Sequence, residues 1–177
     1  MTSSKPARGR HPRRPAARAP RPLYSTDERR RRDETRWTLV QAVLAPLQFA
    51  VFGVSLLLVL RYLHTGQGLA AAQLSFVVKT LLLYTIMVTG SVWEKRVFGR
   101  WLFARAFFWE DVVSMVVLAL HTACLVAMGG GWLGARGQMV LALAAYAAYV
   151  VNATQFVLKL RAARLQDAPH GATEVAA

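Results

Sequence analysis

The sequence has a single cysteine, few acidic residues and none of the motifs that mark the common soluble enzyme classes. Cys124 stands alone among 177 residues, which excludes an intrachain disulfide and a metal site built from several cysteines. No Gly-rich phosphate loop, HExxH or GxSxG sequence is present. We also expect no cleaved signal peptide, because the first apolar run begins only at Trp37 and is too long for one.

Acidic residues are scarce, so nine Asp and Glu face 22 Lys and Arg, and the net charge is +13. Residues 1–36 carry +8 of this excess. Basic segments bind nucleic acids or anionic membrane surfaces. The apolar runs that follow favour the membrane, and we expect no nucleic-acid partner. The Pro-, Arg- and Ala-rich residues 1–22 are predicted to be disordered. Residues 25–36 are predicted to form a short amphipathic piece that Ser25 or Thr26 caps.

Apolar residues are abundant instead, at 55% of the chain. They form four stretches, each with about the 20 residues that a helix needs to cross a bilayer. None shows strand alternation, and only helices and closed barrels satisfy their own backbone in hydrocarbon. The sequence therefore predicts an all-α integral membrane four-helix bundle, with one domain at 23–165 and a short tail at 166–177. The stretches lie at about 37–63, 69–92, 111–128 and 138–158.

Basic residues also predict the orientation of the bundle. Lys and Arg gather in the amino-terminal tail, in the connection between the second and third stretches, and in the carboxyl-terminal tail. The other two connections hold at most one Arg each. The positive-inside rule then places both termini and the middle connection in the cytoplasm. The even number of spans agrees, because it returns the chain to its starting side.

A few ionisable residues lie inside or against these stretches, where such groups are costly and are functional candidates by default. On a helix, Glu110, Ser114 and His121 share one stripe of the third stretch, with Asp111 about a quarter turn away. Every stretch has one more polar face, and we expect these faces to turn inward. The ionisable candidates are Lys79, Glu94, Glu110, Asp111, His121 and Lys159.

Each candidate also has a structural alternative. Glu94 can snorkel to the membrane edge or pair with Lys95, and the two carboxylates that begin the third stretch can cap its helix. The Asn, Gln, Ser and Tyr side chains can serve as hydrogen-bonding glue between helices. His121 fits three roles equally: a hydrogen-bonded core residue, a proton carrier or a metal ligand. Lys79 needs a carboxylate or a ligand anion near it.

The connection between the second and third stretches combines charge with aromatic rings. Residues 94–109 include four Lys or Arg and six aromatic residues, a composition typical of a segment at headgroup depth. We expect an acidic, aromatic-walled mouth at the 93–111 junction. Carboxylates there would act on a flat, apolar ligand that partitions into the bilayer.

Four segments resemble the vinyl hydratases of bacteriochlorophyll biosynthesis. This family is known as 3-vinyl (2-vinyl in older numbering) bacteriochlorophyllide hydratase or chlorophyllide a 3¹-hydratase. The resemblance covers about residues 23–166, and the pair WEK…FG and FFWED is specific to the family. The segments are WTLVQAVLAPLQF (37–49), VVKTLLLYTIMVTGSVWEKRVFGRWLF (77–103), AFFWEDVVSMVVLALHT (106–122) and AAYVVNATQFVLKLRAARL (147–165).

The resemblance implies that water adds across the 3-vinyl group of chlorophyllide a, or of the matching bacteriochlorin, to give a 3-(1-hydroxyethyl) group. Such an enzyme is a carbon–oxygen hydro-lyase that needs no cofactor, because the substrate carries its own Mg. It would be a multi-pass protein of the bacterial inner, photosynthetic membrane. Its partners would be the Mg-tetrapyrrole, membrane lipid and other enzymes of the bacteriochlorophyll pathway.

Hydration chemistry suggests how the candidate residues divide the work. The terminal vinyl carbon needs a proton, and the attacking water needs a base. We hypothesise Glu110 as the acid, with Asp111 keeping it protonated and orienting the water, and Glu94 as the alternate acid. His121 is either the base or an axial ligand to the substrate Mg, and no metal site of the protein's own is expected. Three basic residues are candidates to bind the propionate of the substrate: Lys79, Arg100 or Arg105. Four aromatic residues are candidates to stack on its ring: Trp93, Phe107, Phe108 and Trp109. The polar face of the fourth stretch adds Asn152 and Gln155 as substrate-binding candidates.

Two other classes of function compete with hydration. A non-catalytic pigment-binding or assembly protein would hold the same tetrapyrrole and leave its mass unchanged, whereas hydration adds one water. A small proton-coupled transporter would use Lys79 and His121 as relay groups. Four spans without an internal repeat argue against a transporter.

Overall fold

The computed structural model describes residues 23–167, which form five helices and no strand. Four of the helices are long and apolar enough to cross a membrane, and each contains one of the predicted stretches. The predicted all-α architecture, with four helices long and apolar enough to cross a membrane, is confirmed for this part of the chain. The predicted disorder of residues 1–22 lies outside the described residues, as does the tail beyond 167. The helices are α1 (Thr26–Glu34), α2 (Arg36–Thr65), α3 (Leu69–Phe98), α4 (Phe108–Gly130) and α5 (Ala135–Asp167).

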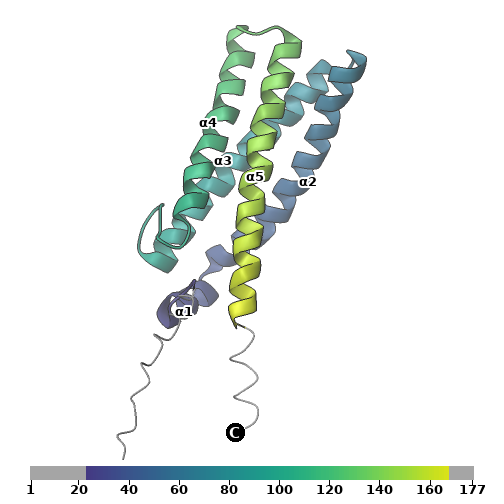
Figure 1. Ribbon diagram of the computed structural model, residues 1–177. Helices are drawn as coiled ribbons and strands as arrows, with labels where there is room; N and C mark the ends of the chain where they lie inside the picture. The colour runs from purple at the N-terminus through teal and green to yellow at the C-terminus, as the bar shows by residue number, and fades with distance from the viewer. Residues whose placement is uncertain (1–22, 168–177) are drawn as a thin grey trace, which may run out of the picture.

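The four long helices run side by side as two antiparallel hairpins, α2 with α3 and α4 with α5 (Figure 1). Helix α1, the connection from α3 to α4 and the last turns of α5 lie at one end of the bundle. We call this end the α1 end and the opposite one the far end. Gly66 ends α2 at the far end with φ of 73°, a left-handed conformation that glycine adopts without strain. The tight turns are thus separated from the longer α3–α4 connection by the length of the bundle.

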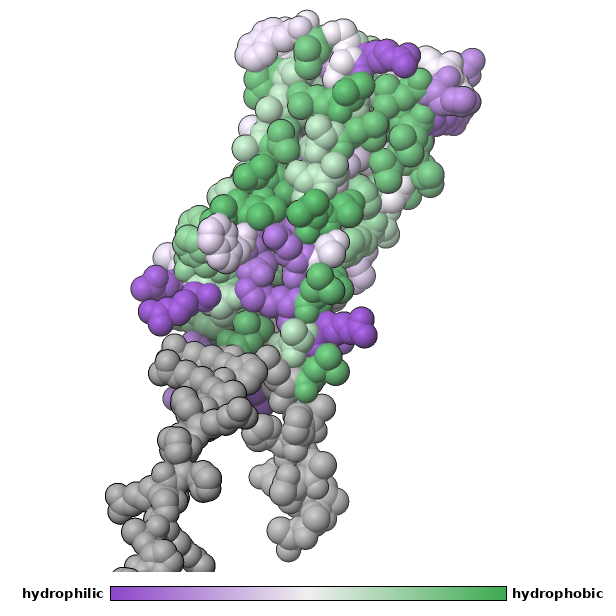
Figure 2. Space-filling view, viewed as in Figure 1, coloured by the Kyte–Doolittle hydropathy of each residue, from purple (hydrophilic) through white to green (hydrophobic). Residues whose placement is uncertain are grey.

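Apolar side chains cover the outside of the bundle between its two ends (Figure 2). Large ones such as Leu57 and Leu74 are mostly exposed. A surface of this kind is stable in lipid and prone to association in water. The same view shows a hydrophilic patch that interrupts the apolar surface in the half nearer to α1.

The polar faces of the long helices turn inward, as predicted. Several of their side chains join neighbouring helices as the expected hydrogen-bonding glue. Ser55 Oγ lies 2.5 Å from Tyr146 Oη, and Asn152 Nδ2 donates to Ser114 Oγ at 2.8 Å. The buried polar side chains in the described part are Gln48, Ser55, Lys79, Thr80, Glu94, Glu110, Asp111, Ser114, His121, Gln138 and Asn152.

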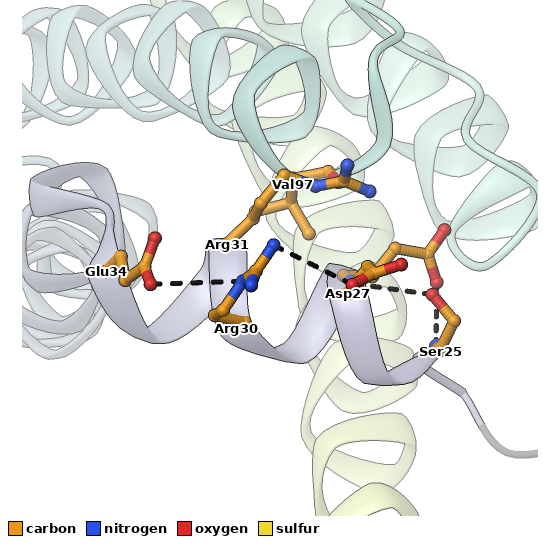
Figure 3. A network of polar contacts seen from close by, with 7 residues as sticks. Ser25, Asp27, Arg30, Arg31, Glu34 and Val97 are labelled. Carbon is orange, nitrogen blue, oxygen red and sulfur yellow. Dashed lines mark hydrogen bonds and ion pairs between the residues drawn. The ribbon is translucent and has the colours of Figure 1, made fainter.

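Helix α1 is charged on all sides. Ser25 and Glu28 form the predicted cap at its start, because each side chain accepts the other residue's backbone N–H, at 2.8 and 3.3 Å. The predicted amphipathic character is wrong: a run of Arg between acidic residues leaves no apolar face, and no residue of α1 is buried. Tyr24, just before the helix, packs against Val97 instead. Arg31 Nε donates to the carbonyl of Val97 at 2.9 Å, which attaches α1 to the end of α3 (Figure 3).

Candidate active site

Three carboxylates meet at the α1 end, where α3 ends and α4 begins. Glu94 lies one turn before the end of α3, and Glu110 and Asp111 lie in the first turn of α4. Their exposed fractions are 5, 8 and 3%. Helix α3 continues to Phe98, past the predicted end of its span. Loop 99–107 can therefore fold back over Glu94 and bring the first turn of α4 beside it.

The carboxyl groups of Glu94 and Asp111 lie beside each other as a pair. Two ionised carboxylates in contact repel each other, so this arrangement favours a proton held by one of them. Each group also accepts a backbone N–H from loop 99–107. Ala104 N–H donates to Glu94 Oε2 at 3.1 Å, and Phe103 N–H donates to Asp111 Oδ2 at 2.8 Å. A positioned proton with fixed donors around it is what general acid catalysis needs.

The structural alternatives for these carboxylates do not describe their contacts. Lys95 Nζ donates to the carbonyl of Gly99 at 3.0 Å, and Glu94 is directed to Ala104 and Asp111. No side-chain hydrogen bond caps the start of α4. Burial also excludes snorkelling of Glu94 toward water. The contacts of the carboxyl pair are thus with loop 99–107 and with each other, and not with Lys95.

Phe103 holds its N–H toward Asp111 in a strained backbone conformation. Its φ is 58°, and no other non-glycine residue in the described part has a positive φ. Such a conformation costs about 1–3 kcal/mol and persists only when surrounding contacts impose it. Its ring, 38% exposed, contacts the ring of Phe108 at 5.8 Å between centroids. The strain therefore lies in the segment that positions the carboxyl pair.

Glu110 has a different partner from its neighbour. Lys159 Nζ, on α5, forms an ion pair with Glu110 Oε2 at 2.5 Å, and the two side chains are 25 and 10% exposed. The same ammonium group lies 5.1 Å from the centroid of the Phe107 ring. Glu110 is thus a paired carboxylate, which separates its chemistry from that of the Glu94–Asp111 pair.

Exposed aromatic and basic side chains lie around the three carboxylates. Trp109 directly precedes Glu110 and is 70% exposed, and Phe108 is 44% exposed. Arg100 and Arg105 are exposed in loop 99–107, whose backbone amides hold the carboxyl pair. An apolar, anionic ligand would meet rings and positive charge here before reaching the carboxylates.

The rest of the predicted aromatic wall is packed inside the protein. Trp93 Nε1 donates to Thr38 Oγ1 at 2.9 Å, and its ring meets the Phe107 ring edge-on at 5.7 Å. Phe107 is 2% exposed and stacks on Phe156 of α5 at 5.9 Å. These rings fix the positions of α2, α3 and α5 beneath the site. Their place in the cluster leaves Trp109 and Phe108 as the rings available to a ligand.

The structure does not bring His121 or Lys79 to the carboxylates. His121 follows Glu110 by eleven residues on α4, a rise of about 16 Å. Its ring is fully buried and stacks on Phe76 at 5.4 Å, and its Nδ1 lies 2.8 Å from the carbonyl of Val117. Lys79, also fully buried, places Nζ 3.6 Å from the centroid of the Tyr149 ring. No carboxylate of the described residues pairs with Lys79, so one of its two expected partners is missing.

Asn152 and Gln155 lie on α5 between the carboxylates and the level of His121 and Lys79. They share the α5 face that also carries Lys159. Asn152 is 8% exposed and bonds Ser114, one turn beyond Glu110 on α4. Gln155 Oε1 is buried and has no hydrogen-bond partner in the described part. Both therefore lie beneath the carboxylate site, on the side toward the middle of the bundle.

The sequence predicts Lys159 as an ionisable candidate but does not assign it to this site, and it gives no prediction for the backbone amides of loop 99–107. The polar face of α5 gave a signal for Lys159. In an antiparallel hairpin, the Asn152–Ser114 contact brings Lys159 level with Glu110. The loop gave no comparable signal, because its path depends on the positive φ of Phe103.

A surface groove on α2 and α3 lies away from this chemistry. It has a volume of about 500 Å³ on the outer faces of α2 and α3, between residues 50–58 and 71–78. Its lining is apolar apart from Ser75, and that hydroxyl already bonds Ser55 at 2.8 Å. Such a groove suits a lipid chain and offers no acid or base.

Comparisons with known proteins match nearly the whole described part of the chain. Residues 24–162 match the family model described as 2-vinyl bacteriochlorophyllide hydratase. The chain is 64% identical over 150 residues to the 2-vinyl bacteriochlorophyllide hydratase of Rhodobacter capsulatus, covering 85% of this chain and 87% of that protein. It is 64% identical over 145 residues to the protein of that name from Cereibacter sphaeroides, covering 82% and 90%. No solved structure matches the chain.

Proposed function

The chain belongs to the family of 2-vinyl bacteriochlorophyllide hydratases, and on this premise we propose that it hydrates the 3-vinyl group of a chlorophyllide in bacteriochlorophyll biosynthesis. The substrate would be chlorophyllide a or the matching bacteriochlorin, and the product would carry a 3-(1-hydroxyethyl) group. The observation that carries this proposal is the 64% identity over 150 residues. The family match also includes every residue of the carboxylate site. As a class, the enzyme is a hydro-lyase.

In the proposed reaction, the proton shared by Glu94 and Asp111 goes to the terminal vinyl carbon. The adjacent carbon becomes a cation that the macrocycle shares, and the oxygen of water bonds to it. Glu110 is the nearby anion that stabilises this cation and takes the proton that the water loses. Return of that proton to the carboxyl pair completes the cycle, so that only water has been added. We thus assign the acid role to the pair that holds a proton, and the base role to the carboxylate expected from sequence to be the acid.

Substrate binding is proposed at the exposed side of the site. Trp109 and Phe108 would stack on the macrocycle, and Arg100 or Arg105 would bind its propionate. Trp93 would support these contacts from within the aromatic cluster. The substrate brings its own Mg, and we propose no further cofactor.

His121 and Lys79 have no place among the reacting groups of this proposal. Both are fully buried about 10 Å or more deeper in the bundle, by the helix rise. The imidazole of His121 is fully buried against Phe76 and Tyr146, so a macrocycle outside the bundle cannot reach its Nε2. A base role or an axial-ligand role for His121 would therefore require α3 and α4 to separate.

We further propose that the bundle lies in the bacterial inner, photosynthetic membrane with its α1 end in the cytoplasm. The basic residues of α1, loop 99–107 and the last turns of α5 gather at this end and support that orientation. The carboxylates then lie near the cytoplasmic surface. Lipid contacts the apolar outside, and other enzymes of the pathway are candidate partners at the cytoplasmic end.

The test is a pigment assay on membranes that contain the expressed protein. We expect chlorophyllide a to gain the mass of one water and its red absorption band to shift to the blue, because the vinyl group leaves the conjugated system. Membranes without the protein serve as the control. If the pigment co-purifies with the protein but its mass is unchanged, hydration is refuted and the pigment-binding alternative is supported.

A further inference from the structure

Buried polar atoms without hydrogen-bond partners gather in the middle of the bundle. Within the described parts of α2 to α5 there are six such side-chain atoms on five residues. Four of the residues are more than nine-tenths buried, with exposed fractions of 0 to 8%. The atoms are Gln48 Oε1 and Nε2, Lys79 Nζ, His121 Nε2, Asn152 Oδ1 and Gln155 Oε1. We call these five residues the polar column.

Contacts around Tyr149 place the members of the column near one another. Lys79 Nζ lies over the Tyr149 ring, and Phe52 packs on the same ring at 5.0 Å. Gln48 precedes Phe52 by one turn on α2, and Asn152 follows Tyr149 by about one turn on α5. Because α2 and α5 run antiparallel, both amides lie at one level of the bundle, on the α1 side of Tyr149.

The two ends of the column are fixed by other contacts. Phe76, one turn before Lys79 on α3, stacks on His121. Gln155 lies one turn beyond Asn152, toward the α1 end. The column therefore draws a residue or more from each of the four long helices and extends along the bundle axis.

Leaving these atoms unpaired would be costly. Each buried donor or acceptor without a partner costs about 1–3 kcal/mol, and native proteins satisfy nearly all such groups with protein or ordered water. Six unpaired atoms in one region would cost as much as the whole stability of a typical domain, about 5–15 kcal/mol. A bound species must supply the missing hydrogen bonds.

The mixture of donors and acceptors identifies that species. His121 Nδ1 faces a carbonyl, which only accepts, so the hydrogen is on Nδ1 and Nε2 of the neutral ring is an acceptor. The column then has four acceptors, on His121, Asn152, Gln155 and Gln48, and two donor groups, on Lys79 and Gln48. An anion would serve only the donors and a metal ion only the acceptors. Water serves both, and it needs two to four polar partners at a buried site.

We propose that the polar column is a binding site for ordered water inside the membrane-spanning bundle. Resting on the proposed function, this water is the reservoir from which the hydration draws its reactant. Asn152 Nδ2 donates to Ser114 Oγ at 2.8 Å, and Ser114 lies one turn from Glu110 on α4. The column therefore meets the carboxylate site at Ser114. On the α1 side, the cluster of Tyr24, Val97, Phe107 and Ala163 covers the bundle with apolar side chains.

Hydroxyl-radical labelling by X-ray radiolysis tests the site without relying on activity, because radicals form from water bound next to a side chain. We expect His121 and Tyr149 of the full chain in detergent or lipid to be oxidised at rates comparable with exposed His64. Met139 is the matched control, since it is fully buried on α5 in an apolar cluster and is intrinsically reactive. Mass spectrometry of the peptides reads out all four residues. Protection of His121 and Tyr149 equal to that of Met139 would overturn the proposal.

A variant locates the water and separates this proposal from the proposed function. Gln48→Leu replaces an amide by an apolar side chain of similar volume, and we expect loss of labelling at Tyr149 with no change at His64. Unchanged labelling of Tyr149 in this variant would place the water elsewhere and refute the column. If Gln48→Leu does not fold, the labelling of the unaltered chain still decides. If His121 is labelled but the protein leaves chlorophyllide unchanged, the water site stands and only hydration is refuted. If His121 is protected in an active hydratase, hydration stands and the water site is refuted.

Discussion

Replacing Lys159 with methionine removes the cation that pairs with Glu110 and keeps an unbranched side chain of similar length. The Glu110 carboxylate, 8% exposed, would then be left buried without that partner. Breaking a fully buried ion pair costs about 3–5 kcal/mol, and an exposed pair contributes about 0–1 kcal/mol. Because the Lys159 side chain is 25% exposed, we expect an intermediate loss of about 2 kcal/mol in the free energy of unfolding.

A double-mutant cycle with Glu110→Gln isolates the ion pair from other effects of the substitution. The double variant should recover part of the stability lost in Lys159→Met, with a coupling energy of about 1–2 kcal/mol. It should not recover hydration, since the proposed base is absent. Lys95→Met is the matched control, because Lys95 is exposed and its ammonium bonds the Gly99 carbonyl and lies 5.9 Å from the centroid of the Trp101 ring. We expect it to change stability by less than about 0.5 kcal/mol.

Unfolding of the purified variants in mixed detergent micelles, followed by circular dichroism, measures these free energies. Equal stability of Lys159→Met and Lys95→Met would refute a stabilising role for the Glu110–Lys159 ion pair. A cycle without coupling between positions 110 and 159 would refute it as well, since the two charges would then act independently.

Three further outcomes follow from the same contacts. Phe103→Gly should raise the free energy of unfolding by about 1 kcal/mol, because it removes the positive-φ strain and keeps the N–H that binds Asp111. Lower stability in the same unfolding assay would mean that the contacts of the Phe103 ring contribute more to stability than the backbone strain costs. Trp109→Ala should raise KM for chlorophyllide a about fivefold through loss of about 1 kcal/mol of stacking, whereas Trp132→Ala, equally exposed at the far end, should leave KM unchanged. The Arg100→Met and Arg105→Met pair of substitutions should raise KM about tenfold for the free propionate. Its effect should vanish with the methyl ester, and an equal effect on both pigments would exclude propionate binding.

The sequence was sufficient for the spans and for the inward polar faces. A helix that crosses a bilayer needs an unbroken apolar stretch of known length, and polar residues in lipid must face other helices. The stripe of Glu110, Ser114 and His121 is therefore buried as predicted. Helical period alone also places His121 far along α4 from Glu110, which argues against the predicted site that contains both residues.

The sequence alone does not predict the contacts within the site, for two physical reasons. Pairing of Glu110 with Lys159 depends on the register between α4 and α5. Helical period does not determine that register. The pairing of Glu94 with Asp111 depends on loop 99–107, whose amides bond both carboxylates. Phe103 in this loop has a positive φ, a conformation that residue propensities disfavour. The prediction that α1 is amphipathic is wrong because its charged residues contain no apolar face.

The most direct test of the account is the single-turnover rate of chlorophyllide a hydration in Glu94→Gln and Asp111→Asn, measured by chromatography and mass spectrometry. Glu34→Gln on exposed α1 is the control for removing a carboxylate. If the carboxyl pair delivers the proton, both substitutions should slow hydration by at least about 100-fold, and the control should hydrate at the unaltered rate. Hydration at that same rate in folded Glu94→Gln or Asp111→Asn would contradict the account.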